Sequence, residues 1–271
     1  MRAKAGDTQL AHFRDGFWWV AAVGHRVGVI TSVENQRVKD VLRLRKSRER
    51  RDSGLFVAEG RREVERAIAA GLTVTEIFVA PELIADWPHS HTEVTPRVLA
   101  KMAYRAEPEG VLAIVEAPHR TLPDNATLIL VAVGIEKPGN LGAMARTADA
   151  AGADALLVAD AQADPWNPNA IRASTGAVFT LPIVEASREQ VQALPLQKIA
   201  AMVAADMTPA DVDLTHPTAL IVGAEDTGLD AQWQQAADAK VAIPMKGHTV
   251  DSLNASNAAA ILLYETLRQR G

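Results

Sequence analysis

The 271-residue sequence contains no cysteine. Disulfide bonds, thiolate metal sites and cysteine nucleophiles are therefore excluded, and nothing in the composition points to an oxidising compartment. No stretch approaches the roughly 18 uncharged apolar residues that a membrane-spanning helix needs. Aromatic residues make up only 4% of the chain, so the apolar 48% is mainly Ala, Val, Leu and Ile. We therefore expect a cytoplasmic protein with no membrane partner, which is long enough for one large domain or two ordinary ones.

Charge is distributed unevenly along the chain. Residues 1–120 carry 19 basic and 16 acidic groups, whereas residues 121–271 carry 9 and 17. The segment from Arg37 to Arg51 holds eight arginines and lysines against only Asp40 and Glu49. Such a cluster suits phosphate contacts but is also typical of a solvated helix face. The basic residues proposed to contact phosphates are Arg37, Lys39, Arg43, Arg45, Lys46 and Arg48.

The first half of the sequence predicts a small α/β module, because strand-like and helix-like segments alternate after Gly54. The predicted elements are strands at Leu55–Ala58, Val74–Ala80 and Val111–Glu116 and helices at Arg61–Ala70 and Val98–Met102. A segment with two prolines and few apolar residues follows and indicates a linker. The predicted divisions are an appendage of unknown role (1–32), a small domain (33–117), a linker (118–126) and a second domain (127–271).

The second half predicts a parallel α/β sheet. Leu128–Ile135 is a nearly continuous aliphatic run, as expected of a strand that is covered on both faces. Further strands are predicted at Ala155–Ala159, Val178–Ile183, Ile199–Val203, Ala219–Val222 and Val241–Ile243, and helices at Leu141–Ala151 and Ala255–Gln269. Ligands of such sheets collect at the carboxyl ends of the strands, so the loops that leave the strands are the places to look for a site.

Three of these loops carry polar side chains. In the first, Asn140 is expected to cap the following helix and Arg146 to lie in its second turn. In the second, two glycines bracket Glu225 and Asp226; in the third, a Gly- and Pro-containing stretch leads to Ser252 and the start of an Ala-rich helix. Taken singly, these residues could be ordinary caps, turns or surface ion pairs. As a set they predict one site.

Four segments taken in order carry a family resemblance: EKPGNLGAMARTADAAG (136–152), NPNAIRASTGAVF (167–179), IVGAEDTGL (221–229) and IPMKGHTVDSLNASNAAAILLYE (243–265). They closely resemble the motifs of the SpoU or TrmH family of SPOUT RNA methyltransferases. The preceding module resembles the ribosomal-protein-like RNA-binding domain found in ribosomal RNA methyltransferases of that family. The resemblance thus covers nearly the whole chain except the appendage.

The resemblance implies a SPOUT domain with a deep trefoil knot, an exception to the rule that folds are unknotted. It implies a homodimer in which the final helix and the first motif helix pack across the interface. It further implies methyl transfer from S-adenosylmethionine, without a metal, to a ribose 2′-hydroxyl of structured RNA. Ribosomal RNA is favoured over transfer RNA because of the accessory domain, and transfer RNA remains the alternative.

The resemblance also implies roles for individual residues. Arg146 would stabilise the developing alkoxide, and the other catalytic residues would orient Arg146 and the cofactor loop. The implied catalytic residues are Asn140, Arg146, Glu225, Ser252 and Asn254. The implied cofactor-binding residues are Gly223, Ala224, Ile243, Met245, Leu253 and Ser256, and Ser174 is implied as a further RNA contact. Two departures are Ala224, where the family often has Asn, and Asn257, where a small apolar residue is common.

Two alternative interpretations assign the protein to a different functional class. Gly139 and Gly142 open a helix after a strand and Asp160 follows one strand later, which imitates the dinucleotide site of a nicotinamide-dependent oxidoreductase. The required G-x-G-x-x-G is absent, and the other two loops stay unexplained. A non-catalytic RNA-binding relative is the second reading, and the intact Asn140 and Arg146 speak against it.

Overall fold

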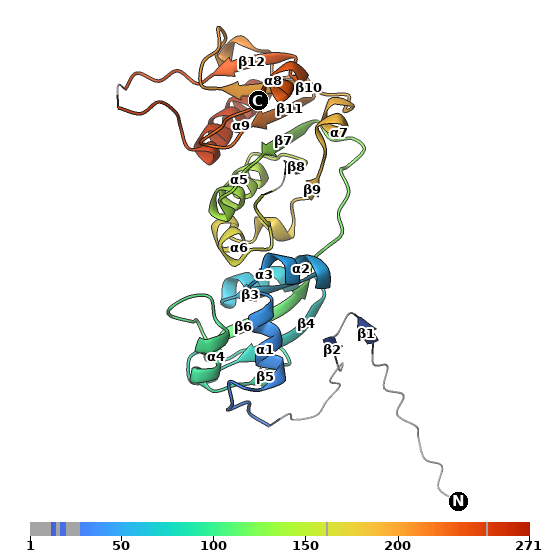
Figure 1. Cartoon of the computed structure of the whole chain (residues 1–271), viewed down its shortest axis with the longest axis vertical. Helices are drawn as coiled ribbons and strands as arrows, with labels where there is room; N and C mark the ends of the chain where they lie inside the picture. Colours follow the sequence, from blue (N-terminus) through green and yellow to red (C-terminus); the bar gives the residue numbers. More distant parts are fainter. Residues whose placement is uncertain (1–11, 15–16, 20–27, 161, 248) are drawn as a thin grey trace, which may run out of the picture. The chain divides into compact units, whose positions relative to one another are not determined.

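The computed structural model describes residues 12–14, 17–19, 28–160, 162–247 and 249–271 (Figure 1). The chain divides into two compact units, Met1–Ala117 and Pro118–Gly271. Most of the predicted appendage lies outside the described residues; within it, the backbones of β1 (His12–Arg14) and β2 (Phe17–Trp19) pair antiparallel. In the described part of the chain, no helix is long and apolar enough to cross a bilayer.

The first unit is built on a four-stranded sheet with the order β3-β6-β4-β5. Its strands are β3 (Leu55–Glu59), β4 (Val74–Val79), β5 (Thr92–Glu93) and β6 (Val111–Glu116). Its helices are α1 (Gln36–Arg43), α2 (Ser47–Ser53), α3 (Arg61–Ala69) and α4 (Pro96–Met102). β6 pairs antiparallel with both β3 and β4, whereas β4 and β5 are parallel. The predicted α/β character of this module is confirmed.

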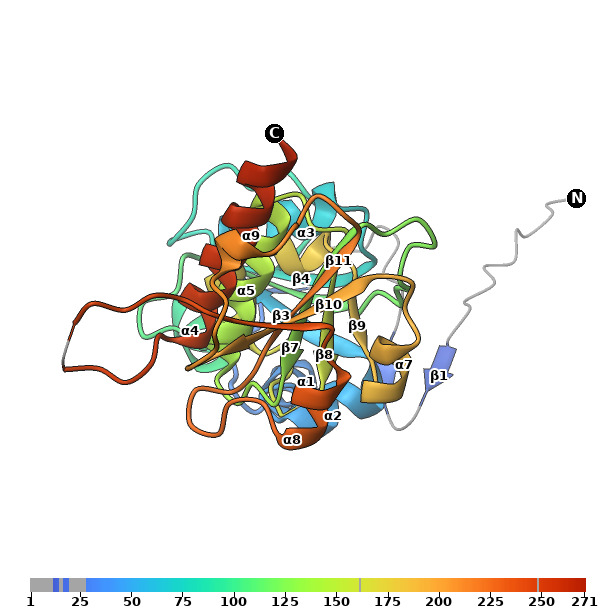
Figure 2. The same ribbon diagram turned by 90° about the horizontal axis from the view of Figure 1, so that it is seen from above.

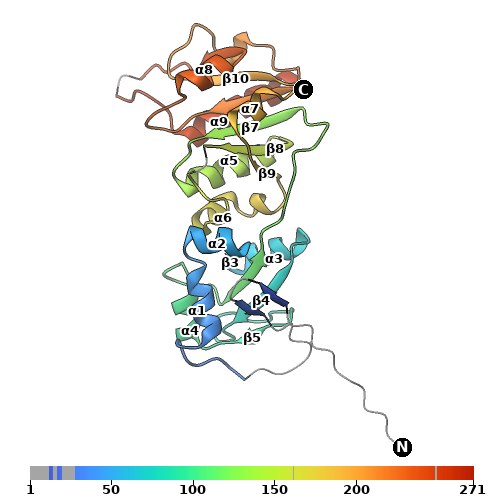
Figure 3. The same cartoon turned by 45° about the vertical axis from the view of Figure 1, so that its right-hand side comes forward.

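The core of the first unit lies between its sheet and helices α1 and α4, which sit together in Figure 3. Buried side chains of both helices, such as Val41 and Leu99, pack there against Leu112 and Ile114 of β6. Ile30 belongs to the same core and exchanges backbone hydrogen bonds with Glu93 and Thr95. The unit therefore takes in residues that precede the predicted boundary at 33.

The second unit contains a six-stranded sheet with the order β12-β10-β11-β7-β8-β9, and every neighbouring pair is parallel. The strands are β7 (Leu128–Val133), β8 (Ala155–Ala159), β9 (Ile183–Glu185), β10 (Gln197–Met202), β11 (Thr218–Val222) and β12 (Ala239–Ala242). The helices are α5 (Pro138–Ala150), α6 (Pro168–Ser174), η1 (Ala177–Phe179), α7 (Arg188–Gln192), η2 (Pro209–Asp211), α8 (Ala231–Ala236) and α9 (Ala255–Arg270). The predicted parallel sheet is confirmed.

Helices cover both faces of this sheet, with α5 and α9 on one side and α7 and α8 on the other (Figure 2). Both faces of the central strand β7 are thereby buried, which is why its sequence shows no alternation of apolar and polar residues. α5 also packs tightly on α6, since a Cβ at Gly142 would lie 2.2 Å from the carbonyl oxygen of Ala170. Glycine is thus required for the approach of these two helices.

The predicted strand at Val178–Ile183 is wrong over most of its length. Val178 and Phe179 are buried, but they belong to the 3₁₀ turn η1 that follows Gly176 with its φ of 93°. Pro182 has no N–H to donate to a ladder, and β9 begins only at the next residue. A short apolar run marks burial but does not distinguish a strand from a buried turn.

Candidate active site

Three loops at the carboxyl edge of the parallel sheet meet through side-chain hydrogen bonds. The Nδ2 of Asn140, from the first turn of α5, donates to Oε1 of Glu225 at 2.8 Å. The Nδ2 of Asn254, which precedes α9, donates to the same oxygen and to Oδ1 of Asn140 at 3.2 Å. The predicted meeting of three loops that lie far apart in sequence is confirmed for these residues, which we call the Glu225 cluster.

Lys137 completes the cluster and was missed in the sequence. Its Nζ donates to Oε2 of Glu225 at 2.5 Å, so each carboxylate oxygen has a donor from this chain. The lysine side chain is 70% exposed and that of Glu225 18%. The hydrogen bond from Lys137 is the main cause that lowers the pKa of Glu225, and the same bond raises the pKa of Lys137. The pair is therefore ionised at neutral pH.

Asn140 does not cap α5, contrary to the sequence prediction. α5 begins at Pro138, and Asn140 lies within its first turn with its amide directed to Glu225. Asn254, in contrast, is the N-cap of α9, because its Oδ1 accepts from the Ser256 backbone N–H at 3.0 Å. The same oxygen accepts from the Ser256 hydroxyl at 2.6 Å. The amide of Asn254 therefore caps a helix with its oxygen and reaches the cluster with its nitrogen.

The loop that presents Glu225 is a tight turn. A Cβ at Gly223 would lie 2.4 Å from the backbone carbon of Gly228, so only glycine fits there. The Gly228 N–H donates to the Ala224 carbonyl at 2.9 Å and closes the turn. A cavity of about 30 Å³ lies beside it, and its walls include Ile135, Lys137, Asn140 and residues 224–227. This volume has room for about one water molecule.

The predicted cofactor-binding residues Ile243, Met245 and Leu253 and the predicted catalytic residue Ser252 differ in their surroundings. Ile243 and Leu253 are half-buried, whereas Met245 is 37% exposed and Ser252 is also exposed. The chain on either side of residue 248 projects from the sheet between β12 and α9 (Figure 2). Among the described residues, no hydrogen bond links Met245 or Ser252 to the Glu225 cluster.

Arg146 lies outside the Glu225 cluster. It is the ninth residue of α5 and is exposed. It follows Asn140 by six residues, which corresponds to ~9 Å along the helix axis and a turn of about 120° around it. Within the described residues, no hydrogen bond links Arg146 to Asn140, Glu225 or Asn254. The expectation that these side chains hold the arginine is not met within one chain.

The basic segment of the first unit contains two kinds of arginine. Arg37 forms an ion pair with Glu76, donates to Oγ1 of Thr92 at 2.6 Å and lies 5.5 Å from the Phe78 ring centroid. Burial lowers the pKa of Arg37. Arg45 donates to the carbonyl of Ala103 at 2.6 Å and so holds the end of α4. These two proposed RNA contacts are engaged inside the unit.

Of the remaining basic residues of the segment, Arg50 is buried and donates to the carbonyl of Leu44 at 2.7 Å, whereas the others are exposed. Exposed ion pairs join Lys39 to Glu34, Arg43 to Glu49 and Arg48 to Asp52. Lys46 and Arg51 are exposed, and no described acidic side chain pairs with either. Surface ion pairs contribute little to stability, so solvent and ions can reach these charged groups.

The second-motif serine, Ser174, is fully buried. Its hydroxyl donates to the carbonyl of Ile171 at 2.7 Å and accepts from the N–H of Gly176 at 3.1 Å. The hydroxyl thus both donates and accepts a hydrogen bond at the end of α6. Because Ser174 is also buried, it is not accessible for the implied RNA contact in this conformation.

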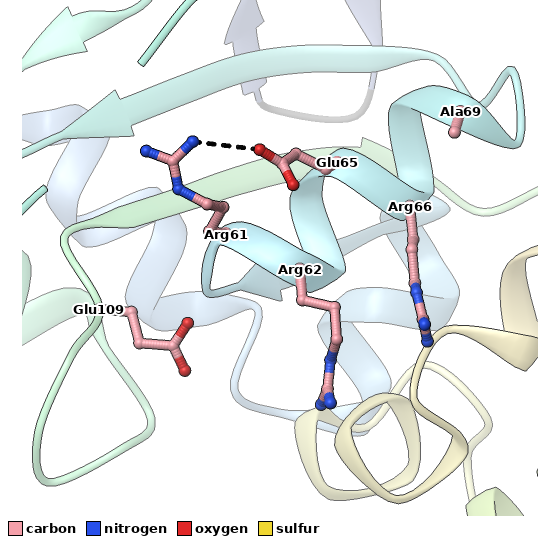
Figure 4. Close-up of a pocket in the computed structure, with 6 residues that line it drawn as sticks. All are labelled: Arg61, Arg62, Glu65, Arg66, Ala69 and Glu109. Atoms are coloured by element: carbon pink, nitrogen blue, oxygen red, sulfur yellow. Dashed lines mark hydrogen bonds and ion pairs between the residues drawn. The ribbon is translucent and has the colours of Figure 1, made fainter. Parts of the chain in front are cut away.

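A second, larger hollow of about 410 Å³ lies along α3 in the first unit. Figure 4 shows Arg61, Arg62 and Arg66 on its wall, with Arg61 paired to Glu65 and with Glu109 facing them. Acidic side chains offset the arginines, so size alone does not make this hollow an anion site.

Comparison with known proteins decides the family. The model of the SpoU rRNA Methylase family matches residues 127–264, and the model of the MRM3-like substrate binding domain matches residues 35–113. The chain belongs to the SpoU rRNA methylase family. This confirms the resemblance seen in the motifs and removes the dinucleotide-binding reading, whose acid Asp160 instead accepts a hydrogen bond from Trp233.

Three similar proteins illustrate the family. The chain is 32% identical to the 23S rRNA (guanosine(2553)-2′-O)-methyltransferase RlmP of Bacillus subtilis, over 87% of this chain and 97% of the relative. An RNA 2′-O ribose methyltransferase of known structure is 42% identical, with a TM-score of 0.78 over 90% of this chain and 99% of the other. An AdoMet-bound rRNA methyltransferase from Sinorhizobium meliloti is 30% identical, with a TM-score of 0.80 over 90% and 98%. The SPOUT fold class is confirmed, while the knot stays a prediction.

Proposed function

We propose that this SpoU-family protein transfers a methyl group from S-adenosylmethionine to a ribose 2′-hydroxyl of 23S ribosomal RNA. The observation that carries the proposal is the Glu225 cluster, which joins three family motifs at one edge of the sheet. The similarity to ribosomal RNA enzymes extends through both units, which favours ribosomal over transfer RNA.

The residues present fit the methyl donor. Its sulfonium is cationic, and the ionised Glu225 supplies a negative charge beside the cavity. The close turn at Gly223 and Ala224 and the half-buried Ile243 and Leu253 suit a flat, partly apolar adenosine. Met245 and Ser256 would complete the site, and S-adenosylmethionine supplies an electrophilic methyl group when bound.

A ribose hydroxyl is a weak nucleophile, so the chain must stabilise the negative charge that develops on its oxygen. Arg146 is the proposed group, because a guanidinium stays protonated and can act only by electrostatic stabilisation. Asn140 and Asn254 would orient the hydroxyl through their amides while Glu225 fixes both. Ser252 would join from the projecting segment.

The active unit is proposed to be a homodimer. α9 exposes an apolar stripe in which Ile261 is 41%, Tyr264 51% and Leu267 40% exposed. These residues lie on one side of the helix, and a stripe of this kind favours association. Because α5 packs on α9, a second copy on this stripe would approach the exposed Arg146. The arginine would then act at an interface rather than beside the cluster of its own chain.

The basic surface of the first unit is proposed to anchor RNA phosphates. Lys39, Arg43, Lys46 and Arg48 are exposed there, and Arg51 adds a further charge. Arg37 and Arg45 would support this surface through their bonds to Thr92 and to the carbonyl of Ala103. The substrate would place the protein in the cytoplasm with the ribosome.

The experiment compares purified 23S ribosomal RNA with transfer RNA as acceptor of a tritiated methyl group. We expect incorporation into ribosomal RNA at one 2′-hydroxyl, which alkaline resistance of the neighbouring phosphodiester would locate. Titration calorimetry should show binding of S-adenosylmethionine and none of NAD. Methylation of transfer RNA alone, or of a base instead of a ribose, would overturn the proposal.

A further inference from the structure

Asp160 occupies an unusual position at the carboxyl end of β8. Its φ of 49° lies in the left-handed region, which non-glycine residues seldom adopt. Its Oδ2 accepts a hydrogen bond of 2.8 Å from the indole Nε1 of Trp233. Asp160 thus combines a sparsely populated backbone conformation with a hydrogen bond to a side chain distant in sequence. Such conformations persist only where the surrounding structure maintains them.

Trp233 connects this point to the loop that carries Glu225. Trp233 is 1% exposed and belongs to the same buried cluster as Leu229, which ends that loop. Asp230 caps α8 by accepting from the Trp233 backbone N–H at 2.7 Å, and Gln234 donates to the Leu229 carbonyl at 2.7 Å. The start of α8 is therefore fixed to the end of the 223–229 loop.

The chain around Asp160 is connected on its other side to the loop after β7. The N–H of Gly134 donates to the Ala159 carbonyl at 2.9 Å, and that of Ala163 donates to the Ile135 carbonyl at 3.0 Å. Ile135 lines the small cavity together with Lys137 and Asn140. Asp160 thus stands between the loop that carries Asn140 and the helix that holds the Glu225 loop.

We propose that the Asp160–Trp233 hydrogen bond is a positioning device that sets the distance between Asn140 and Glu225 for cofactor binding and methyl transfer. It rests on the proposed function, since it assigns a role to residues that support the same site. The bond acts through two loops and touches no reacting group. Asp160 and Trp233 are positioning residues.

The test compares three single variants of the bonded pair, a control variant and a double variant, all in the full-length protein. Trp233→Phe keeps most of the buried ring and removes the donor, whereas Asp160→Ala removes the acceptor. A misplacement of reacting groups by about 1 Å costs about 100-fold in rate, and loss of one supporting bond is expected to move the loops by less, so each variant should lower kcat about 10-fold. Each should also raise the dissociation constant for S-adenosylmethionine several-fold. Asp160→Asn keeps an oxygen acceptor and tolerates the left-handed conformation, so it should recover kcat to within about threefold of the wild type.

Asp154→Ala is the matched control. The Oδ2 of Asp154 accepts from the backbone N–H of Thr127 and of Leu128, at 2.7 and 2.9 Å, at the opposite edge of the same strands. Its loss should lower the melting temperature and leave kcat and cofactor affinity unchanged. The double variant Asp160→Ala/Trp233→Phe should lose no more activity than either single change, since one bond is removed in each case.

The outcomes distinguish failure of the proposed function from failure of the positioning role. A wild-type protein that neither binds S-adenosylmethionine nor methylates ribosomal RNA would reject the proposed function. An active wild type with Trp233→Phe and Asp160→Ala equal to it in kcat and affinity would reject the positioning role alone. An equal loss of kcat in Asp154→Ala would also reject it, because the effect would then be general destabilisation.

Discussion

Replacement of Glu225 by glutamine tests the Glu225 cluster most directly. The side chains have nearly the same shape, but the carboxylate accepts on both oxygens, from Lys137 on one and from Asn140 and Asn254 on the other. Glutamine has one acceptor and one NH₂ group. The new NH₂ group must then face either the ammonium of Lys137 or the amide donors of Asn140 and Asn254, and the negative charge is lost.

The magnitude follows from the number of contacts broken. A hydrogen bond to a charged group contributes about 1.5–3 kcal/mol, and the Glu225 side chain is only 18% exposed. Because about 1.4 kcal/mol corresponds to a factor of 10, loss of one such bond predicts a 10- to 100-fold fall in kcat/KM. Asn140→Ala should cause a fall of the same order, since it removes one of the amide donors to the same oxygen.

The assay is single-turnover methylation of ribosomal RNA, with cofactor affinity measured separately by calorimetry. Lys137→Met is the internal comparison, because its ammonium is largely in solvent and its loss leaves both amide contacts intact. We expect only a small change for that variant. A Glu225→Gln protein that stays within threefold of the wild type in both measurements would refute the view that this carboxylate organises the site.

Three further predictions concern other parts of the chain. Arg146→Ala should abolish methyl transfer. If the arginine serves the site of a second subunit, a mixture of Arg146→Ala with Glu225→Gln should be more active than Glu225→Gln alone; a mixture no more active than that variant would contradict the arrangement. The pKa of Glu265 is lowered to about 2, chiefly by its hydrogen bond from the arginine three residues later. Because this pKa is lowered in the folded protein, the ionised carboxylate contributes stability at pH values above 4.5, and this contribution is lost as the pH falls toward 2. The difference in melting temperature between wild type and Glu265→Gln should therefore shrink between pH 4.5 and pH 2. A constant difference would refute the assignment. Changing Lys46 and Arg51 to glutamate should weaken RNA binding and flatten its salt dependence, and an unchanged slope in filter-binding titrations would count against the proposed surface.

Sequence periodicity predicted those elements that burial alone determines. The run that became β7 is apolar on both faces because helices cover both, and a sheet of such strands is parallel. The convergence of Asn140, Glu225 and Asn254 followed from one rule, that loops after parallel strands meet at one edge. Sequence periodicity gave the wrong element at Val178–Ile183. Burial of a short apolar segment does not reveal whether its backbone is an extended strand or a helical turn.

Side-chain partners were much harder to predict than elements. Arg37 reads as a phosphate contact in a basic run, yet Glu76 and Thr92 take up its guanidinium from strands distant in sequence. Lys137 shows no motif of its own, and only the position of Glu225 reveals its role. Charge patterns indicate where ions gather, whereas pairing depends on which strands become neighbours, and that is a property of the fold.

The double role of Asn254 links the site to the surface of α9. Its amide oxygen fixes the first turn of that helix, while its amide nitrogen bonds Glu225 and Asn140. A helix behaves as a stiff element, so the position of this cap depends on how α9 is packed along its length. The apolar stripe at Ile261 and Tyr264 lies on the same helix, within three turns of the cap. A second copy that covers the stripe would therefore restrain α9 and, through Asn254, the geometry around Glu225, which gives a physical reason for a SpoU-family site to depend on assembly.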